Sequence, residues 1–317
     1  MANPPTVSVV IPLYNKRSTI GRSLASVLAQ TFGDFEVIVV DDGSQDDGAD
    51  YVAAQFADPR VRLHRQANAG PGAARNAGLT LSRGPFITFL DADDDWRPVL
   101  LETAVAELAA HPECAVFTAA YLREPEGVDR WAELYARGFA EGPWRLLPAI
   151  PPAELLDCVA AFHACTAVYR RETVARYGGF YAKDRCTLGE DSYLWIQILL
   201  NDPIYRHMTP LGRYHMEDSE LGIGARGRNL PLEPALTDPG PIRAVCPPDL
   251  RGVLELWFAQ QAARTAFMQL ARGDADKAAW LVKAFPAVRG LGLDYLKLRL
   301  RLMNPGLWSG LKRLAGR

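Results

Sequence analysis

Four carboxylates stand within five positions, directly after the apolar run 86–90: Asp91, Asp93, Asp94 and Asp95. The run predicts a buried strand, so these acids lie where that strand ends. Like charges this close repel each other, and burial adds a desolvation cost that a bound cation relieves. Carboxylate oxygens on a rigid strand end suit Mg2+ or Mn2+, which usually keep waters and share substrate phosphates. The alternative is a polar turn with an Asp-rich helix cap ahead of Pro98.

The composition limits the classes of protein to consider. The chain has 317 residues, 49% of them hydrophobic, so it can bury a substantial core as one large domain or two. Its net charge of −2 gives no signature of nucleic-acid binding. Five cysteines without a Cys-x-x-Cys pair argue against a zinc knuckle or a disulfide framework, and favour a reducing compartment.

The N-terminus and the hydrophobicity pattern predict a cytoplasmic protein. Residues 1–6 contain no basic segment followed by an apolar core, so no signal peptide is expected. No run approaches the roughly 20 apolar residues that cross a bilayer. The basic C-terminal region, described below, leaves open a location at the inner face of the membrane.

Apolar runs rich in β-branched residues alternate with helical patterns before the acidic cluster. The runs 7–12, 35–40, 61–64 and 86–90 predict strands that are buried on both faces, as in a parallel sheet. Helices are expected between them, the last one opening from the glycine-rich loop 68–72. Short connections between alternating strands and helices are typical of a mostly parallel, Rossmann-like α/β sheet flanked by helices.

Two of the predicted strands end in acids. Asp41 and Asp42 follow the second strand, and the cluster at Asp91 and Asp93 follows the fourth. Tyr14 follows the first strand. In open parallel sheets ligands bind beyond the carboxyl ends of the strands, so these side chains are expected to share one rim.

The segment 123–152 interrupts the regular pattern. It is rich in Pro and Glu, contains Trp131 and Trp144, and predicts one short helix near residues 131–137. Excursions of this length in compact domains are often functional.

The pattern becomes informative again beyond residue 160. Residues 162–169 alternate like a strand, and 188–200 predict a helix with Glu190 and Asp191 in its first turn. Acids at that place can serve as charge–dipole caps, worth about 0.3–1 kcal/mol. Residues 205–207 and 211–215 predict two short edge strands.

Taken together, the motifs resemble those of the family 2 inverting glycosyltransferases, which have the GT-A fold and use nucleotide sugars. Order and spacing agree across roughly the first 220 residues, and a series of motifs is far more specific than any one of them. They are VSVVIPLYN at 7–15, VVDDGS at 39–44, NAG at 68–70 with ARN at 74–76, LDADD at 90–94, GGF at 178–180, GED at 189–191 and YH at 214–215.

The resemblance implies roles for individual residues in holding the donor. Pro12 and Tyr14 would line the nucleobase pocket, and Asp41 would hydrogen-bond the base or ribose. Asp91 would contact the ribose. Arg75 would lie near the diphosphate or position the neighbouring acids.

The resemblance also implies a metal site and a catalytic base. Asp93 would hold Mn2+ or Mg2+ on the diphosphate, and Asp191 would be the base. His215 falls where some relatives present a histidine near the metal, and a structural role is its alternative. Glu190 would either raise the pKa of Asp191 by like-charge repulsion or orient the acceptor.

The implied activity is a non-processive, inverting transfer from a nucleotide sugar, with UDP-sugars favoured, to a hydroxyl of a glycan or lipid-linked glycan. The Gln-x-x-Arg-Trp motif of processive synthases is absent after Asp191. A sugar nucleotidyltransferase is disfavoured because a Gly-rich basic loop does not follow the first strand. An inactive nucleotide-sugar-binding or scaffold protein is the remaining alternative.

We expect residues 1–220 to form the GT-A domain, with a nucleotide-sugar half over 1–120 and an acceptor half over 121–220. Residues 221–317 would be a linker and a C-terminal helical extension, with helices over 250–270 and from Asp274. The last helices interleave leucines with basic residues, which suits an anionic membrane surface. Docking on the chain's own domain and a homodimer contact are the alternatives.

Overall fold

The computed structural model describes residues 3–129, 131–136, 138–219 and 231–303. The chain divides into two compact units, one formed by Met1–Leu146 with Cys158–Glu220 and the other by Leu147–Asp157 with Leu221–Arg317. The predicted boundary between residues 220 and 221 lies outside the described residues. So does the part of the predicted basic, leucine-rich helical region that lies beyond residue 303. The division into nucleotide-sugar and acceptor halves stays a prediction.

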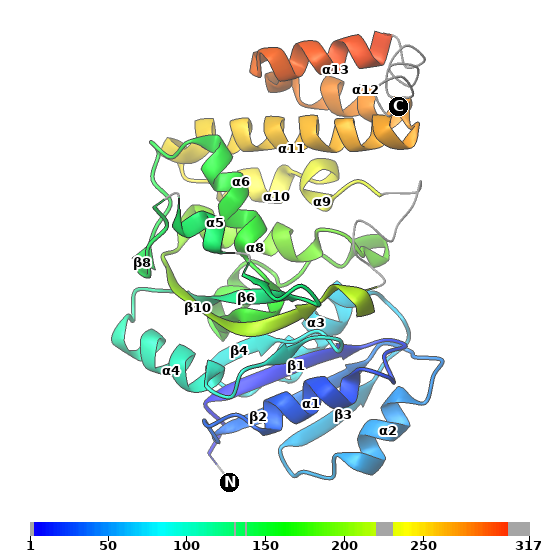
Figure 1. Cartoon of the computed structure of the whole chain (residues 1–317), viewed down its shortest axis with the longest axis vertical. Helices are drawn as coiled ribbons and strands as arrows, with labels where there is room; N and C mark the ends of the chain where they lie inside the picture. The colour runs from blue at the N-terminus through cyan, green and yellow to red at the C-terminus, as the bar shows by residue number, and fades with distance from the viewer. Residues whose placement is uncertain (1–2, 130, 137, 220–230, 304–317) are drawn as a thin grey trace. The chain divides into compact units, whose positions relative to one another are not determined.

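Four parallel strands form one side of the sheet in the first unit. β1 (Val7–Leu13) lies between β2 (Phe35–Asp41) and β4 (Phe86–Phe89), and β3 (Val61–Arg65) pairs with the far side of β2. The residues of β2 are buried throughout, as the continuous apolar pattern predicts. Figure 1 shows these strands side by side, with their carboxyl ends at one edge.

The other side of the sheet is mixed. The strand order is β3-β2-β1-β4-β9-β6-β10-β5, and β9 (Ala167–Arg170) is antiparallel to both β4 and β6. Instead of two short edge strands, β10 is one 12-residue strand, Ile204–His215, with β6 (Val116–Glu124) parallel on one side. β5 (Asp95–Trp96) pairs with its far end, so the edge-strand prediction was wrong.

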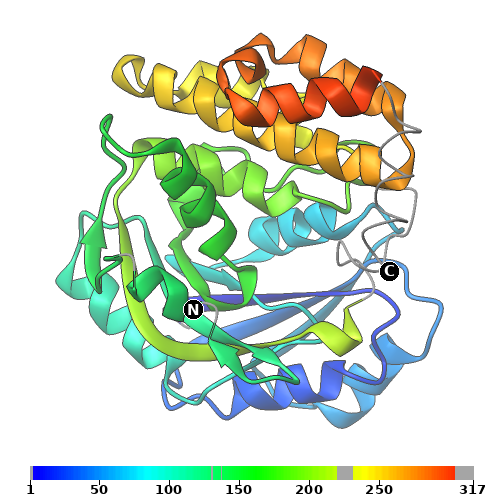
Figure 2. The same cartoon turned by 45° about the horizontal axis from the view of Figure 1, so that its top comes forward.

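Helices cover both faces of the parallel part of the sheet. Figures 1 and 2 show α1 (Ile20–Leu28) and α2 (Gly48–Gln55) on one face and α3 (Pro71–Leu81) on the other. α3 lies very close to β1. A Cβ added at Gly78 would be only 2.2 Å from a Val10 methyl carbon, so only glycine allows this approach. The small residues of α3 thus let the helix carry its polar side chains toward the rim.

The remaining elements of the first unit complete the sheet and its cover. The predicted excursion contains the expected short helix and adds two short strands. The predicted α/β fold with a central sheet flanked by helices is confirmed. The elements are α4 (Leu100–Ala110), β7 (Val128–Asp129), α5 (Ala132–Tyr135), β8 (Gly142–Trp144), α6 (Pro152–Ala161, which continues from the second unit), α7 (Arg171–Arg176) and α8 (Glu190–Asn201).

The second unit is helical. The 22-residue helix α11 (Arg251–Arg272) has α12 (Ala275–Ala284) and α13 (Leu293–Met303) packed along it, as Figures 1 and 2 show. Two short helices precede it, α9 (Pro234–Thr237) and α10 (Gly240–Val245). The helix predicted from Asp274 is α12, and Asp274 caps it, since its carboxylate accepts the Lys277 amide at 3.0 Å. Within the described residues, none of the helices combines the length and the hydropathy that a membrane span needs.

Candidate active site

The carboxyl ends of β1 and β2 place the predicted nucleobase residues together. Leu13 is in register with Asp41, so Tyr14 and Asp41 come from adjacent strand ends. The Tyr14 side chain is 44% exposed, which leaves its ring accessible, whereas Asp41 is buried. One Asp41 oxygen accepts the Ser44 amide at 3.0 Å, which fixes the carboxylate at the rim.

The neighbouring Asp42 organises the loop that leads into α3. Its two oxygens accept the side-chain amide of Gln66 and the backbone amides of Ala69 and Gly70 at 2.7–2.9 Å. Gly70 has φ +93°, a conformation that favours glycine. Asp42 therefore sets the start of α3 and, with it, the position of Arg75.

Arg75 joins the two halves of the predicted site. Its guanidinium donates to Asp91 Oδ1 at 2.7 Å and to Glu190 Oε1 at 2.8 Å, and its side chain is 4% exposed. Burial favours the neutral arginine, but the charges of Asp91 and Glu190 outweigh it and raise the pKa of Arg75. Burial also favours a protonated Asp91, yet the charge and hydrogen bond of Arg75 hold the pKa of Asp91 below its usual value.

We expect Arg75→Met to lower the free energy of unfolding by about 3 kcal/mol, because removing one partner leaves buried charge uncompensated. Arg65→Met is the matched control: its pair with Asp50 spans 2.5 Å, but both side chains are more than half exposed, so a much smaller loss than for Arg75→Met is expected. Urea denaturation of both variants makes the comparison. Equal losses in the two variants would show that Arg75 is not the buried counter-ion of this site.

Asp191 lies in the first turn of α8, which begins after Gly189 in the left-handed conformation at φ +76°. Burial and the charge of Glu190 raise the pKa of Asp191 to about 7, although Arg75 and a 2.6 Å hydrogen bond from the Ser192 amide oppose the shift. A carboxyl group with this pKa can accept a proton near neutral pH. Asp191 and Asp91 both have Arg75 as a neighbouring charge.

Asp93 is placed where a cation is favoured. Burial and the charge of Asp91 raise its pKa, and the Lys16 ammonium lies 3.1 Å from Asp93 Oδ2. Lys16 also donates to the Asp218 carbonyl, and Arg22 donates to the Asp93 carbonyl and to Asp218 Oδ2. The donor set consists of carboxylate oxygens at a rigid strand end, which fits Mg2+ or Mn2+.

His215 is held by acids other than Asp93. Its Nε2 is 2.7 Å from Asp95 Oδ2 and its Nδ1 is 3.2 Å from Glu217 Oε1, while its backbone amide donates to Asp94 at 3.1 Å. It stands at the acidic cluster, but the structure does not pair its ring with Asp93. Its role as a metal ligand stays a prediction.

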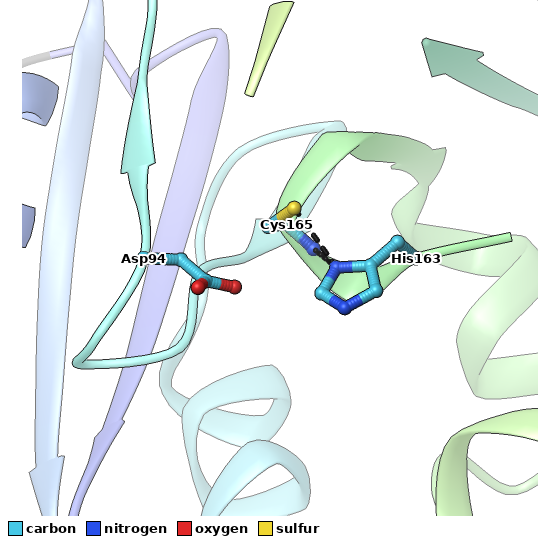
Figure 3. A group of neighbouring side chains, drawn as sticks. All are labelled: Asp94, His163 and Cys165. Atoms are coloured by element: carbon cyan, nitrogen blue, oxygen red, sulfur yellow. Dashed lines mark hydrogen bonds between the residues drawn. The ribbon is translucent and has the colours of Figure 1, made fainter. Parts of the chain in front are cut away.

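The Asp94 carboxylate points toward His163 and Cys165, as Figure 3 shows. Among the described residues, its buried Oδ2 has no hydrogen-bond partner. Burial and the charge of Asp93 raise the pKa of Asp94 well above its usual value, and burial lowers the pKa of His163 to about 4. Burial thus disfavours the charged form of both side chains in the interior behind Asp93.

The structure adds residues that the sequence analysis did not assign to the site. Lys16, Arg22 and Asp218 contact Asp93 or each other, although Asp93 and Asp218 lie far from residues 16–22 in the sequence. The only sequence signal was a basic residue, Lys16, two positions after Tyr14 at the end of the first strand.

Comparison with curated proteins gives partial matches. The chain is 50% identical over 95 residues to the succinoglycan biosynthesis protein ExoO of Rhizobium meliloti, covering 30% of this chain and 27% of that protein. It is 40% identical over 99 residues to the uncharacterized glycosyltransferase YibD of Escherichia coli, covering 31% and 28%. The matches thus span less than a third of the length of these relatives.

Solved structures share the fold over most of the chain. TarS of S. aureus, residues 1–349 in complex with UDP-GlcNAc, has a TM-score of 0.59 at 18% identity over 90% of this chain and 92% of that one. The mannosyltransferase PcManGT of Pyrobaculum calidifontis, in complex with GDP-Man and Mn2+, has a TM-score of 0.55 at 19% identity over 96% and 87%. The family model for glycosyl transferase family 2 matches residues 8–178, more than half of the chain. With the rim acids, Arg75 and Asp191 gathered on this fold, the chain belongs to glycosyl transferase family 2.

Proposed function

We propose that this protein transfers a single sugar from a nucleotide-sugar donor, a UDP-sugar, to a hydroxyl group of a glycan or lipid-linked glycan, with inversion at the anomeric carbon. The observation that carries the proposal is the Asp191 carboxyl group, whose pKa of about 7 suits a base, beside Arg75, which also binds Asp91 at the donor rim. The buried Arg75 is thus a neighbouring charge of both the proposed base, Asp191, and the proposed ribose contact, Asp91.

The donor would bind at the rim. Tyr14 offers an accessible ring to a nucleobase, and Asp41 and Asp91 offer acceptors to the base and ribose. The bound UDP-GlcNAc in TarS, which shares this fold, supports a uridine nucleotide, while GDP-Man in PcManGT marks the nearest alternative. Pro12, on the same strand end as Tyr14, completes the proposed base pocket.

Asp93 would hold a divalent cation on the donor diphosphate, with His215 as the further candidate ligand. When bound, the cation would supply Lewis-acid stabilisation of the leaving diphosphate. The Lys16 ammonium lies 3.1 Å from Asp93 Oδ2. If a divalent cation replaced it at Asp93, the ammonium would be available to pair with the diphosphate.

Asp191 would accept the proton of the acceptor hydroxyl as its oxygen attacks the anomeric carbon from the face opposite the leaving group. One displacement inverts that carbon. Arg75 would keep Asp91 ionised and hold Glu190 beside the base. Single addition, rather than polymer synthesis, is supported by the missing Gln-x-x-Arg-Trp motif after Asp191. The name of the relative ExoO supports a place in polysaccharide biosynthesis.

A thermal-shift screen of nucleotide sugars with Mn2+ tests the proposal. A ligand at 100 times its Kd stabilises the native state by about 2.7 kcal/mol, so the melting temperature should rise by about 4 °C for a protein of this size. The UDP-sugars are expected to give the largest shift, and Tyr14→Ala is expected to reduce it. Failure of every nucleotide sugar to shift the melting temperature would reject a nucleotide-sugar-dependent activity.

A further inference from the structure

The helix α13 carries two apolar faces. Leu298 is fully buried, and Arg301 lies over the Phe267 ring of α11 with its guanidinium carbon 4.8 Å from the ring centroid. These contacts fix α13 within the second unit. A helix that only packs on its neighbours needs one apolar stripe, so further apolar residues on its outer side call for a separate explanation.

The outer face of α13 bears an exposed apolar stripe. Its members follow the spacing i, i+3, i+7, i+10, which aligns side chains along one side of a helix. Their exposed fractions are 51–72%, so they are among the most exposed large apolar side chains of the described chain. They are Leu293, Leu296, Leu300 and Met303.

Basic side chains flank this stripe. At 3.6 residues per turn, Arg299 projects about 40° beyond one edge of the stripe and Lys297 about 40° beyond the other. Both are exposed, and the segment Ala275–Met303 contains six basic and two acidic residues in a chain whose net charge is −2. Trp280 of α12 adds an exposed aromatic ring to the same basic segment.

We infer that the outer face of α13 binds the surface of a bilayer that contains anionic lipids. Leucine side chains would enter the boundary between headgroups and acyl chains, while Arg299 and Lys297 would extend toward the phosphates. A second copy is disfavoured as occupant, because a two-fold contact would bring the same cation-flanked stripe against itself. The inference is independent of the proposed transferase activity.

Flotation of the full chain with vesicles tests the inference. We expect the protein to float with phosphatidylcholine vesicles that contain phosphatidylglycerol, and to float less with pure phosphatidylcholine or at high salt. Leu296→Gln/Leu300→Gln is expected to lower the partition coefficient about tenfold, because two leucines no longer leave water. The matched control is Leu147→Gln/Leu256→Gln, which changes two exposed leucines elsewhere in the second unit.

Thermal melting of both double variants verifies that each is folded. Flotation that the stripe variant loses and the control keeps would support the inference. It would be overturned if the full chain failed to float with anionic vesicles, or if both variants floated like the unsubstituted protein. A dimer in sedimentation experiments that only the stripe variant dissociates would also overturn it, since a second copy would then cover the stripe.

Discussion

Asp191→Asn is expected to abolish sugar transfer while nucleotide binding is retained. The amide cannot accept the proton of the acceptor hydroxyl, and loss of a general base typically costs about 10²–10⁴ in rate. The change is nearly isosteric, and Arg75 keeps its hydrogen bonds to Asp91 and Glu190. Initial rates with the donor found in the screen measure the loss, and the melting-temperature shift with that donor verifies that the variant still binds it.

The pH dependence gives the same prediction a second readout. Because burial and Glu190 raise the pKa of Asp191 to about 7, the base is protonated below that pH, and kcat/KM should increase as the pH rises through about 7. Glu190→Gln removes the like charge and should move this rise to lower pH. An unchanged profile with a higher KM for acceptor would assign Glu190 to acceptor binding instead. Near-normal transfer by Asp191→Asn would refute the base assignment.

The parallel part of the sheet could be predicted because its strands can be recognised from local residue patterns. The continuous β-branched runs of β1 and β2 can be buried only in a sheet that is covered on both faces, and the acids after them then share a rim. The sequence predicts two short strands in place of β10 because Pro210 interrupts the strand pattern. In the structure, the pairing with β6 has a register shift at this place, between His207 and Gly212. Pairing with β6 on both sides of the shift stabilises β10 as one strand, and this pairing cannot be predicted from the local sequence.

The internal geometry of the site could not be predicted from periodicity. Arg75 and Glu190 are separated by 115 positions, and only the folded chain shows that one guanidinium serves both Glu190 and Asp91. Resemblance placed Arg75 near the acids, but it did not select between a diphosphate contact and a positioning role. The buried bridge favours positioning. Lys16 was missed for the same reason, since its partner Asp93 lies on another strand end.

Removal of divalent cations is expected to lower activity by about a hundredfold or more, with Mn2+ or Mg2+ restoring it, because Lewis-acid stabilisation contributes several kcal/mol. Excess EDTA followed by add-back measures this effect. Asp93→Asn should give a comparable loss that added cation does not restore. Full activity in EDTA would remove the metal from the proposed reaction and leave Lys16 as the charge that faces the diphosphate.

Direct Mn2+ binding, followed by the loss of the free-ion electron paramagnetic resonance signal, separates the residues around Asp93. Asp93→Asn should weaken binding in the absence of nucleotide. Lys16→Met should strengthen it, because the ammonium 3.1 Å from Asp93 Oδ2 competes with the cation for the same oxygen. Arg17→Met is the matched control, since that neighbouring cation pairs with the exposed Asp47 at 3.5 Å. Weaker binding after Lys16→Met would mean that the lysine positions Asp93 for the metal and does not compete with it, and equal affinities in all three variants would place the cation away from Asp93.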